Sequence, residues 1–486
     1  MSKIEKYRHM KNNNLFIGRQ EELARLALLK EKKTASLVVV TGRRRIGKSR
    51  LINQFATNSP FLQFSGLPPT EKTSAQDQRN EFAKQLQRQG LPNVIAHDWS
   101  DLFALLTVKI TTGFHIVLLD EISWMGDKDP NFLGKLKNIW DMEWSKNPKL
   151  IVILCGSVSS WIEKNILSST GFLGRISEHI KLNPLSLKEC NQLLEALGFR
   201  GSIYEKLMLL SVTGCIPWYI EQIHPKLSAS DNIKRLCFTP QGILVQEFKK
   251  LFHDLFGRRN EIYRRIIETL VEKNLSLTKI SETLHYERSG ALSEYLTDLV
   301  DSYFIAKISP WSIKTGKISK ISRYRLTDNY LRFYLKYIEP HIDKIEQNLF
   351  KNQAITSMTG WDAMLGLQFE NLVVNNALSM FAILKINPLE VVMAGPFYQR
   401  KTVKQKGCQI DYLIQTKFKT LYLIEVKFSR NPIESAIIEE IKEKIARLVL
   451  PKGYACLPVL IHVNGVTSAV EACDYFYKII DLNQLL

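Results

Sequence analysis

The chain has 486 residues, of which 45% are hydrophobic, and 66 Lys and Arg against 48 Asp and Glu give a net charge of +18. This length predicts roughly three domains, and the hydrophobic fraction excludes an intrinsically disordered chain. No apolar run reaches the roughly 18 residues of a membrane-spanning helix, and the first residues lack the apolar core of a signal peptide. The charge favours a polyanionic partner, with nucleic acid as the first candidate, although a generally basic proteome is the alternative.

Cysteine and histidine usage bears on the compartment and on metals. Seven cysteines are scattered without a Cys-x-x-Cys pair, and nine histidines show no metal-ligand spacing. An odd, unclustered set of cysteines is typical of reduced thiols. We therefore expect a cytoplasmic protein and no zinc site.

Between about residues 16 and 180, short apolar runs alternate with helical patterns. This alternation predicts an α/β fold with a parallel sheet and crossover helices. The expected strands are Leu37–Thr41, Phe61–Ser65, His115–Asp120 and Leu150–Gly156.

The segment after the first expected strand fits the pattern G-x-x-x-x-G-K-[ST], and an amphipathic helix follows it. A strand, a glycine loop and a helix together form a phosphate cradle, because backbone N–H groups then point at the phosphates. Lys48 is expected to reach the β- and γ-phosphates and Ser49 to contact Mg²⁺, which predicts binding of ATP or GTP. The nucleotide-binding residues predicted here are Gly42, Arg43, Arg44, Arg45, Ile46, Gly47, Lys48, Ser49 and Arg50.

Two acids, Asp120 and Glu121, end the third expected strand. We expect this strand to lie beside the glycine-loop strand, with Asp120 holding Mg²⁺ and Glu121 polarising the attacking water. Ser157 is a candidate sensor of the γ-phosphate, with an ordinary turn as the alternative. Arg175 is a candidate arginine finger, and a solvated surface arginine is an equally weighted alternative.

A break near Asn183–Ser186 precedes a capping-box match, Ser186–Glu189, and a helical region up to about residue 240. Three helices are then expected at Tyr263–Glu272, Thr278–Leu284 and Ser289–Val300. Two strands follow, Tyr303–Ile308 and Ser322–Leu326, joined by the basic loop Lys314–Lys320. This order predicts a winged helix-turn-helix. A helical domain with a hairpin that binds only protein is the alternative.

Several motifs in the first half resemble the archaeal-type ATPases of the AAA/STAND group. They are the box Phe16–Leu23 (FIGRQEEL), the glycine loop, Leu119–Glu121, Leu154–Ser157 and Thr213–Pro217. The resemblance covers roughly residues 14–345 and implies that Phe16, Ile17 and Arg19 lead into an ATP site while Pro217 packs near the base. Cys215 replaces the second glycine of the family's Gly-Gly-Ile-Pro, and Trp218 stands where a sensor-2 cation would, so we expect no sensor 2.

The C-terminal part contains Asp411 and Glu425 on two adjacent expected strands, Gln409–Ile414 and Leu421–Phe428. Glu425 and Lys427 project from one face of a strand, and a hairpin would bring Asp411 to them. The spacing Asp-x₁₃-Glu-x-Lys resembles the PD-(D/E)XK restriction-endonuclease-like core, although Ile410 replaces the family's proline. The resemblance implies that Asp411 and Glu425 bind Mg²⁺ or Mn²⁺, that Lys427 acts on the attacking water, and that Glu370 is an additional acid. A solvated Glu–Lys pair on an edge strand is the alternative.

Glu370 falls within the expected helical stretch Asp362–Met380, and a further helix is expected at Glu434–Leu448. We thus expect four parts: a P-loop ATPase core (14–183), a helical lid (184–244), a winged helix (245–345) and an endonuclease-like α/β domain (355–486). The predicted function is ATP hydrolysis that gates DNA engagement or cleavage, with defence against foreign DNA as one role. The alternatives are a regulatory ATPase switch that binds DNA or protein and cleaves nothing, and a scaffold that binds a protein partner. Oligomerisation is compatible with each.

Overall fold

The computed structural model describes residues 15–157, 159–256, 259–287, 290–403 and 405–486. The chain forms two compact units. The first holds the described residues up to Asn183 with those of 251–260 and 301–303, and the second holds the rest. The predicted end of the ATPase core coincides with this division, and most of the other three predicted parts lies in the second unit. Residues 14 and 289, at the ends of two predicted segments, lie outside the described residues.

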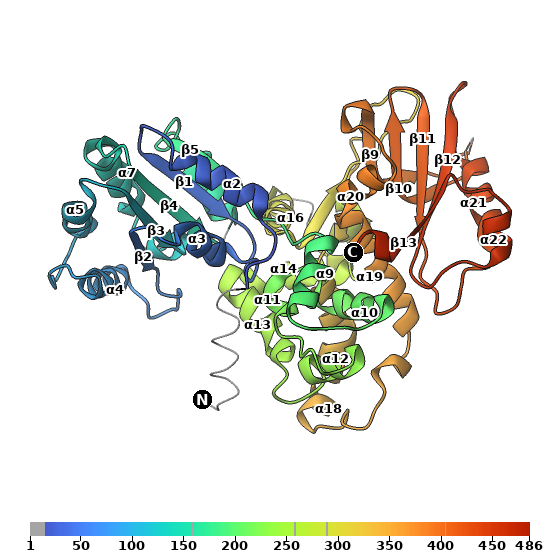
Figure 1. Cartoon of the computed structure of the whole chain (residues 1–486), viewed down its shortest axis with the longest axis horizontal. Helices are drawn as coiled ribbons and strands as arrows, with labels where there is room; N and C mark the ends of the chain where they lie inside the picture. The colour runs from blue at the N-terminus through green and yellow to red at the C-terminus, as the bar shows by residue number, and fades with distance from the viewer. Residues whose placement is uncertain (1–14, 158, 257–258, 288–289, 404) are drawn as a thin grey trace. The chain divides into compact units, whose positions relative to one another are not determined.

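The first unit contains a five-stranded parallel sheet in the order β2-β3-β4-β1-β5 (Figure 1). Its central strands are apolar and rich in Val, Ile and Leu, and they are buried on both faces, as parallel strands covered by helices require. This confirms the predicted α/β class. The strands are β1 (Ser36–Thr41), β2 (Phe61–Ser65), β3 (His115–Asp120), β4 (Leu150–Gly156) and β5 (Ile176–Lys181).

The sequence predicts that β3, which ends in Asp120, lies directly beside β1, which leads into the glycine loop. This prediction is wrong. β4 lies between β3 and β1, with Leu154 aligned to Leu119 on one side and to Val39 on the other. All three strands are buried on both faces, so hydrophobic pattern identifies them as strands but does not order them. The sequence also missed β5, an edge strand whose polar residues Ser177, Glu178 and His179 are only half-buried.

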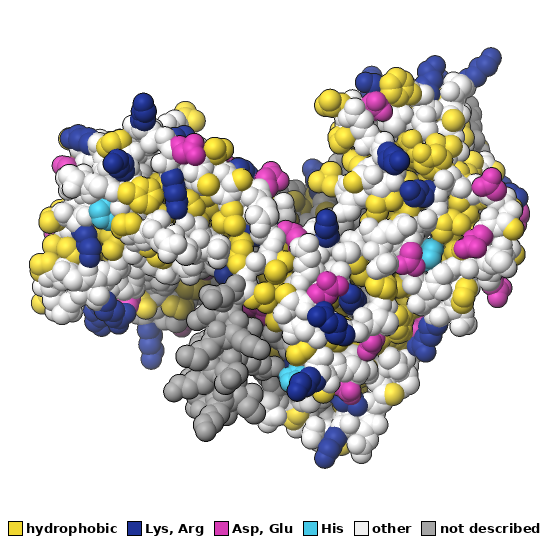
Figure 2. Space-filling view, in the orientation of Figure 1, with side chains coloured by type: hydrophobic (Ala, Val, Ile, Leu, Met, Phe, Trp, Pro, Cys, Tyr) yellow, Lys and Arg dark blue, Asp and Glu magenta, His cyan; other side chains and the backbone are white. Residues whose placement is uncertain are grey.

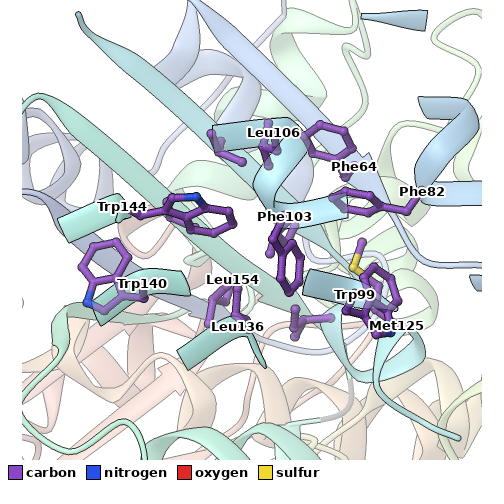
Figure 3. Close-up of a cluster of buried hydrophobic side chains, with 14 of the residues drawn as sticks. Phe64, Phe82, Trp99, Phe103, Leu106, Met125, Leu136, Trp140, Trp144 and Leu154 are labelled. Carbon is purple, nitrogen blue, oxygen red and sulfur yellow. The ribbon is translucent and has the colours of Figure 1, made fainter. Parts of the chain in front are cut away.

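Helices α4 (Ala75–Arg88), α5 (Trp99–Ile110) and α7 (Phe132–Met142) cover one face of this sheet. Their aromatic side chains form one layer with Phe64 of β2 (Figure 3). The ring centroid of Trp99 lies 4.7 Å from Phe132 and 5.6 Å from Phe103. The other helices of this unit include α2 (Gln20–Leu29), α3 (Lys48–Ala56), α6 (Ile122–Met125) and α8 (Ser159–Ile162).

The second unit begins with helices that follow the predicted capping box, in which Ser186 and Glu189 exchange hydrogen bonds. An antiparallel sheet in the order β6-β8-β7 follows, with β6 between α14 and α15 and with β7 and β8 after α16. The helices in chain order are α9 (Leu187–Ala196), α10 (Ile203–Thr213), α11 (Pro217–Ile220), α12 (Ala229–Cys237), α13 (Ile243–Phe256), α14 (Asn260–Thr269), α15 (Leu277–Leu284), α16 (Gly290–Asp301), α17 (Asn329–Phe333) and α18 (Ile342–Glu346). The strands are β6 (Leu275–Ser276), β7 (Ile305–Ile308) and β8 (Arg323–Leu326).

A mixed sheet in the order β13-β12-β11-β10-β9 closes the second unit. Strands β9 to β11 are antiparallel, and β11 to β13 are parallel. Helix α21 packs Ile437 and Ile441 on the face to which Leu413 and Leu423 belong. The elements are α19 (Trp361–Asn375), α20 (Ala377–Ile383), β9 (Val391–Gln399), β10 (Cys408–Thr416), β11 (Thr420–Val426), α21 (Ala436–Arg447), β12 (Ala455–His462), α22 (Ser468–Ala472) and β13 (Lys478–Asp481).

The helical stretch predicted over Asp362–Met380 is confirmed, and it consists of two helices, α19 and α20, that are separated at Asn376. The Asn376 amide donates to the Leu372 carbonyl at 2.8 Å, while its carbonyl oxygen accepts from the Leu187 N–H at 2.9 Å. An asparagine that bonds backbone groups in this way competes with the helix. Among the described residues, no helix combines the length and the apolarity needed to cross a membrane.

Replacing Trp99 by Ala should destabilise the first unit by about 3–5 kcal/mol, because the change leaves a cavity in the aromatic layer. Hydrogen–deuterium exchange of the β1–β4 amides, read by mass spectrometry, measures the loss. Val108→Ala on the same helix is the matched control, since Val108 is 75% exposed. Equal protection in both variants would contradict this packing.

Candidate nucleotide and metal sites

The predicted phosphate cradle joins the end of β1 to the start of α3. Gly47 precedes α3 with a φ of 96°, a conformation that costs glycine little. Gly42 has a φ of 146°, and a Cβ atom there would lie 2.8 Å from the Leu182 carbonyl oxygen. Both glycines are therefore required by the backbone path of the loop.

Lys48 and Ser49 open α3 and meet the ends of β3 and β4. The Lys48 ammonium donates to the carbonyl oxygens of Gly42 (2.9 Å) and Arg43 (3.2 Å) and to Ser157 Oγ (2.9 Å). The Ser49 hydroxyl donates to Asp120 Oδ2 at 2.8 Å. The hydroxyl and the carboxylate predicted to serve Mg²⁺ are thus in direct contact.

Glu121 lies beside this group. Its carboxylate accepts from the Ser157 hydroxyl at 2.7 Å and from the Ser157 N–H at 3.1 Å. Its backbone has a φ of 51°, which is unusual for glutamate and typical of functional positions. The structure therefore brings together Lys48, Ser49, Asp120, Glu121 and Ser157.

The N-terminal box lies against the same loop. Arg19 is buried with a φ of 62° and donates to the carbonyl oxygens of Asn183 (2.6 Å) and Ile46 (3.4 Å). Arg50 donates to the Leu15 carbonyl at 2.5 Å, next to the half-buried Phe16 and Ile17. These bonds fix the start of the chain to the glycine loop.

The three arginines inside the loop differ in environment. Arg43 is buried, Arg45 has a φ of 70°, and the Arg44 guanidinium lies 5.8 Å from the centre of the Trp124 ring. Trp124 follows the two acids on α6, so this cation–π contact links the loop to the end of β3.

The second candidate site lies at the ends of β10 and β11. The strand register pairs Tyr412 with Ile424, and continuing it by one residue sets Asp411 opposite Glu425. Asp411 Oδ2 accepts from the Val426 N–H at 2.9 Å. Glu425 is fully buried, and its Oε1 has no hydrogen-bond partner among the described residues. The antiparallel hairpin predicted here is confirmed.

Burial and mutual repulsion act on the carboxylates of this site. Burial, with the charge of Asp411 next in size, raises the pKa of Glu425 to about 8. The same two causes raise the pKa of Glu370, on α19, to about 7, against the opposing charge of Arg325. Burial also raises the pKa of Asp411. Carboxylates held together out of water are characteristic of functional sites.

Two lysines from different elements approach these acids. Lys444 of α21 donates to Glu425 Oε2 at 2.5 Å, whereas Lys427 donates to Glu440 Oε1 at 2.6 Å. Lys444 therefore contacts the buried carboxylate, and sequence reasoning missed it. The signal is the spacing of Ile437, Ile441 and Lys444, which places the three on one helix face toward the sheet.

The donor set fits a hard divalent cation, because two opposed carboxylates include one buried, unpartnered oxygen. In the part of the chain that the structure describes, no three His, Cys, Asp or Glu side chains form a ready-made metal site. A shared ion at Glu370, Asp411 and Glu425 therefore stays a prediction.

Comparison with known proteins identifies the first site. Residues 16–223 match the family model described as an ATPase domain predominantly from Archaea. This segment is similar to P-loop ATPase domains of the archaeal type. The match ends within the second unit and includes α9, α10 and α11.

Three further proteins are similar to this chain, and the first of them shares its fold. A Walker-type ATPase of Pyrococcus abyssi is 16% identical, with a TM-score of 0.51 over 66% of this chain and 96% of that chain. An uncharacterized protein of Methanocaldococcus jannaschii is 25% identical over 422 residues, which are 85% of this chain and 88% of the relative. The ORC2 protein of Aeropyrum pernix is 14% identical over 70% of this chain and 98% of its own, with a TM-score of 0.42.

Arg175 and Pro217 are the two remaining residues that the sequence predicts for the ATP site. Arg175 donates to both carboxylate oxygens of Asp141 on α7, at 2.7 and 2.8 Å. Its role as an arginine finger stays a prediction. Pro217 is the first residue of α11, in the second unit, and its role at the base also stays a prediction.

Arg175 lowers the pKa of Asp141 to about 2. A pKa below the ordinary 3.8 stabilises the fold above about pH 4, and this stabilisation is lost as the pH falls toward about 2. We expect Arg175→Gln to lower the melting temperature at neutral pH, and the deficit to shrink on acidification.

Asp141→Asn is the matched control for the role of Arg175, because it breaks the same ion pair and leaves the arginine in place. If Arg175 acts on ATP, Arg175→Gln lowers ATP turnover and Asp141→Asn does not. Equal turnover in the two variants would assign Arg175 to the ion pair alone.

Proposed function

We propose that this protein hydrolyses ATP in its first unit and cleaves nucleic acid with a divalent-metal site in its second unit. The contact between Ser49 and Asp120, with Glu121 bound to Ser157 next to Lys48, supports the first activity. The buried, unpartnered oxygen of Glu425 opposite Asp411 supports the second.

In the ATPase site each side chain has a distinct task. Lys48 neutralises the β- and γ-phosphates, and its hydrogen bonds to the Gly42 and Arg43 carbonyls and to Ser157 support this role. Ser49 and Asp120 would hold Mg²⁺, which supplies charge neutralisation when bound. Glu121 orients the attacking water, and Ser157 couples Glu121 to the phosphate-facing lysine.

In the second site Asp411 and Glu425 would hold Mg²⁺ or Mn²⁺, which activates water and stabilises phosphodiester charge when bound. Glu370 contributes a third carboxyl group nearby. The Lys444 ammonium offsets part of the cost of burying the Glu425 carboxylate, and it is the lysine that faces the scissile phosphate. Lys427, which the sequence motif favours, instead orders the surface acid Glu440.

The segment from α14 to β8 is proposed to be a winged helix. Helices α14, α15 and α16 accompany the three-stranded sheet β6-β8-β7, with β6 between α14 and α15 and with β7 and β8 after α16. The β7–β8 loop contains Lys314, Lys317 and Lys320. The motif order supports DNA as the partner.

A regulatory ATPase switch without nuclease activity is the second candidate function. The observation that favours it is the lack, among the described residues, of a preformed three-ligand metal site. In that case the second unit binds DNA or protein, and Glu370, Asp411 and Glu425 have no catalytic role.

Lys48→Ala should abolish tight ATP binding, because it removes the cation that faces the phosphates. Glu121→Gln should retain ATP binding but slow turnover, by roughly a hundredfold or more if Glu121 orients the water. Fluorescent-nucleotide titration and phosphate release measure the two effects. Wild-type turnover in Glu121→Gln would remove Glu121 from catalysis.

Asp411→Asn and Lys444→Met should each reduce Mn²⁺- or Mg²⁺-dependent cleavage of labelled DNA by about 10²-fold or more. Lys427→Met is the matched control and should stay within a few-fold of wild type. All three should hydrolyse ATP normally. Loss of cleavage in Lys427→Met alone would assign the catalytic role to Lys427, the lysine of the sequence motif. Absence of cleavage by the wild type with either metal would favour the regulatory switch.

A further inference from the structure

A large cavity lies within the second unit, between the β7–β8 loop and strands β9 and β10. Its volume is about 1500 Å³, and Asp411 and Lys444 are part of its wall. Small-molecule pockets usually measure roughly 300–1,000 Å³. The described residues that line it include nine Lys and Arg but one carboxylate, Asp411.

The β7–β8 loop is fixed to the C-terminal sheet and forms one side of this cavity. Trp311 and Ile313 are buried in the same hydrophobic cluster as Leu413 and Leu423. The Trp311 indole donates to the Gln415 side-chain oxygen at 2.9 Å, and the Gln415 amide donates to the Ile313 carbonyl at 3.0 Å. This loop is therefore a structural part of the endonuclease-like domain.

Cations from both sides of the cavity lack acidic partners. Lys314, Lys317 and Lys320 come from the β7–β8 loop, and Arg400 and Lys401 follow β9. All five are exposed, and no ion pair is recorded for any of them among the described residues. Figure 2 shows the Lys and Arg side chains of one face of the molecule among hydrophobic and acidic side chains.

An aromatic ring, that of Tyr398, lies in the wall of the same cavity. Tyr398 of β9 is half-buried in the cavity wall, and the Arg323 guanidinium of β8 lies 4.9 Å from the centre of its ring. Basic grooves with stacking side chains are the usual means by which proteins hold single strands. A duplex-reading wing, in comparison, needs its loop free to enter a groove, and here Trp311 holds the loop against the sheet.

We propose that this cavity binds the sugar–phosphate backbone of single-stranded nucleic acid and leads it to Asp411. The β7–β8 loop supplies Lys314, Lys317 and Lys320 to one side of the strand, and the segment after β9 supplies Arg400 and Lys401 to the other. Cleavage of the strand rests on the function proposed above, whereas its binding does not require the metal or ATP.

The test measures binding of a labelled single-stranded oligonucleotide to the full chain in EDTA, without ATP, as fluorescence anisotropy over a range of salt. The variants are a triple change of Lys314, Lys317 and Lys320 to Ala and a double change of Arg400 and Lys401 to Ala. The matched control changes Lys188, Lys226 and Lys344 to Ala, three exposed lysines of the second unit that do not line the cavity.

Wild type and the control should bind with the same salt dependence. The triple variant should bind at least tenfold more weakly at about 0.1 M salt, and its slope of log affinity against log salt should fall by about 2, since each single-strand phosphate contact contributes about 0.7. In the double variant the slope should fall by about two thirds as much as in the triple variant, because two contacts are removed instead of three.

Equal loss of binding in the control and the triple variant would overturn the proposal, because net charge alone would then explain binding. Tighter binding of duplex than of single strand by wild type would also overturn it. If the wild type binds the strand but does not cleave it after addition of Mn²⁺, the binding proposal holds and the proposed nuclease activity is overturned. If the wild type cleaves the strand but the cavity variants bind it as tightly as the wild type, the nuclease activity holds and the binding proposal is overturned.

Discussion

Two buried arginines hold the second unit together. Arg332 of α17 donates to the Val271 and Leu326 carbonyls and to the Gln368 side chain, at 2.8–3.0 Å. Arg325 of β8 donates to Asn371 and Asn375 of α19. Burial lowers the pKa of Arg332 to about 10, so its charge persists at neutral pH. A buried charge is tolerated only when its donors are bonded, and these bonds join β8 and α17 to α19.

The same network reaches the end of the ATPase domain. The Gln368 amide donates to the Ser211 carbonyl of α10 at 2.8 Å and to the Asn329 carbonyl at 2.7 Å. Glu370 lies two residues further along α19, and both buried arginines oppose the rise of its pKa. The elements that end the ATPase domain, carry the basic loop and supply the acids are therefore connected by side-chain hydrogen bonds. This explains why most of the three predicted parts lies in one compact unit.

The local chemistry could be predicted from the sequence, but its three-dimensional partners could not. The glycine loop and the acids ending β3 are short-range patterns, and the structure brings Lys48, Ser49, Asp120, Glu121 and Ser157 together. The order of β3, β4 and β1 depends on which fully buried strands pair, and their similar apolar sequences do not encode this. The break at Asn376 depends on its bond with Leu187, far away in the sequence. Lys444 was missed for the same reason, since its link to Glu425 arises only when α21 packs on the sheet.

The two lysines near the acids show how burial separates a functional pair from a surface pair. Lys427 and Glu440 are partly exposed, and an ion pair in such a position contributes little to stability. Glu425 is fully buried beside Asp411, where an apolar pair of similar size would stabilise the sheet at no electrostatic cost. Lys444 offsets only part of this cost, because one Glu425 oxygen has no partner among the described residues. A cation at that oxygen, and a polyanion along the basic wall beside it, would balance the charges that the fold places there.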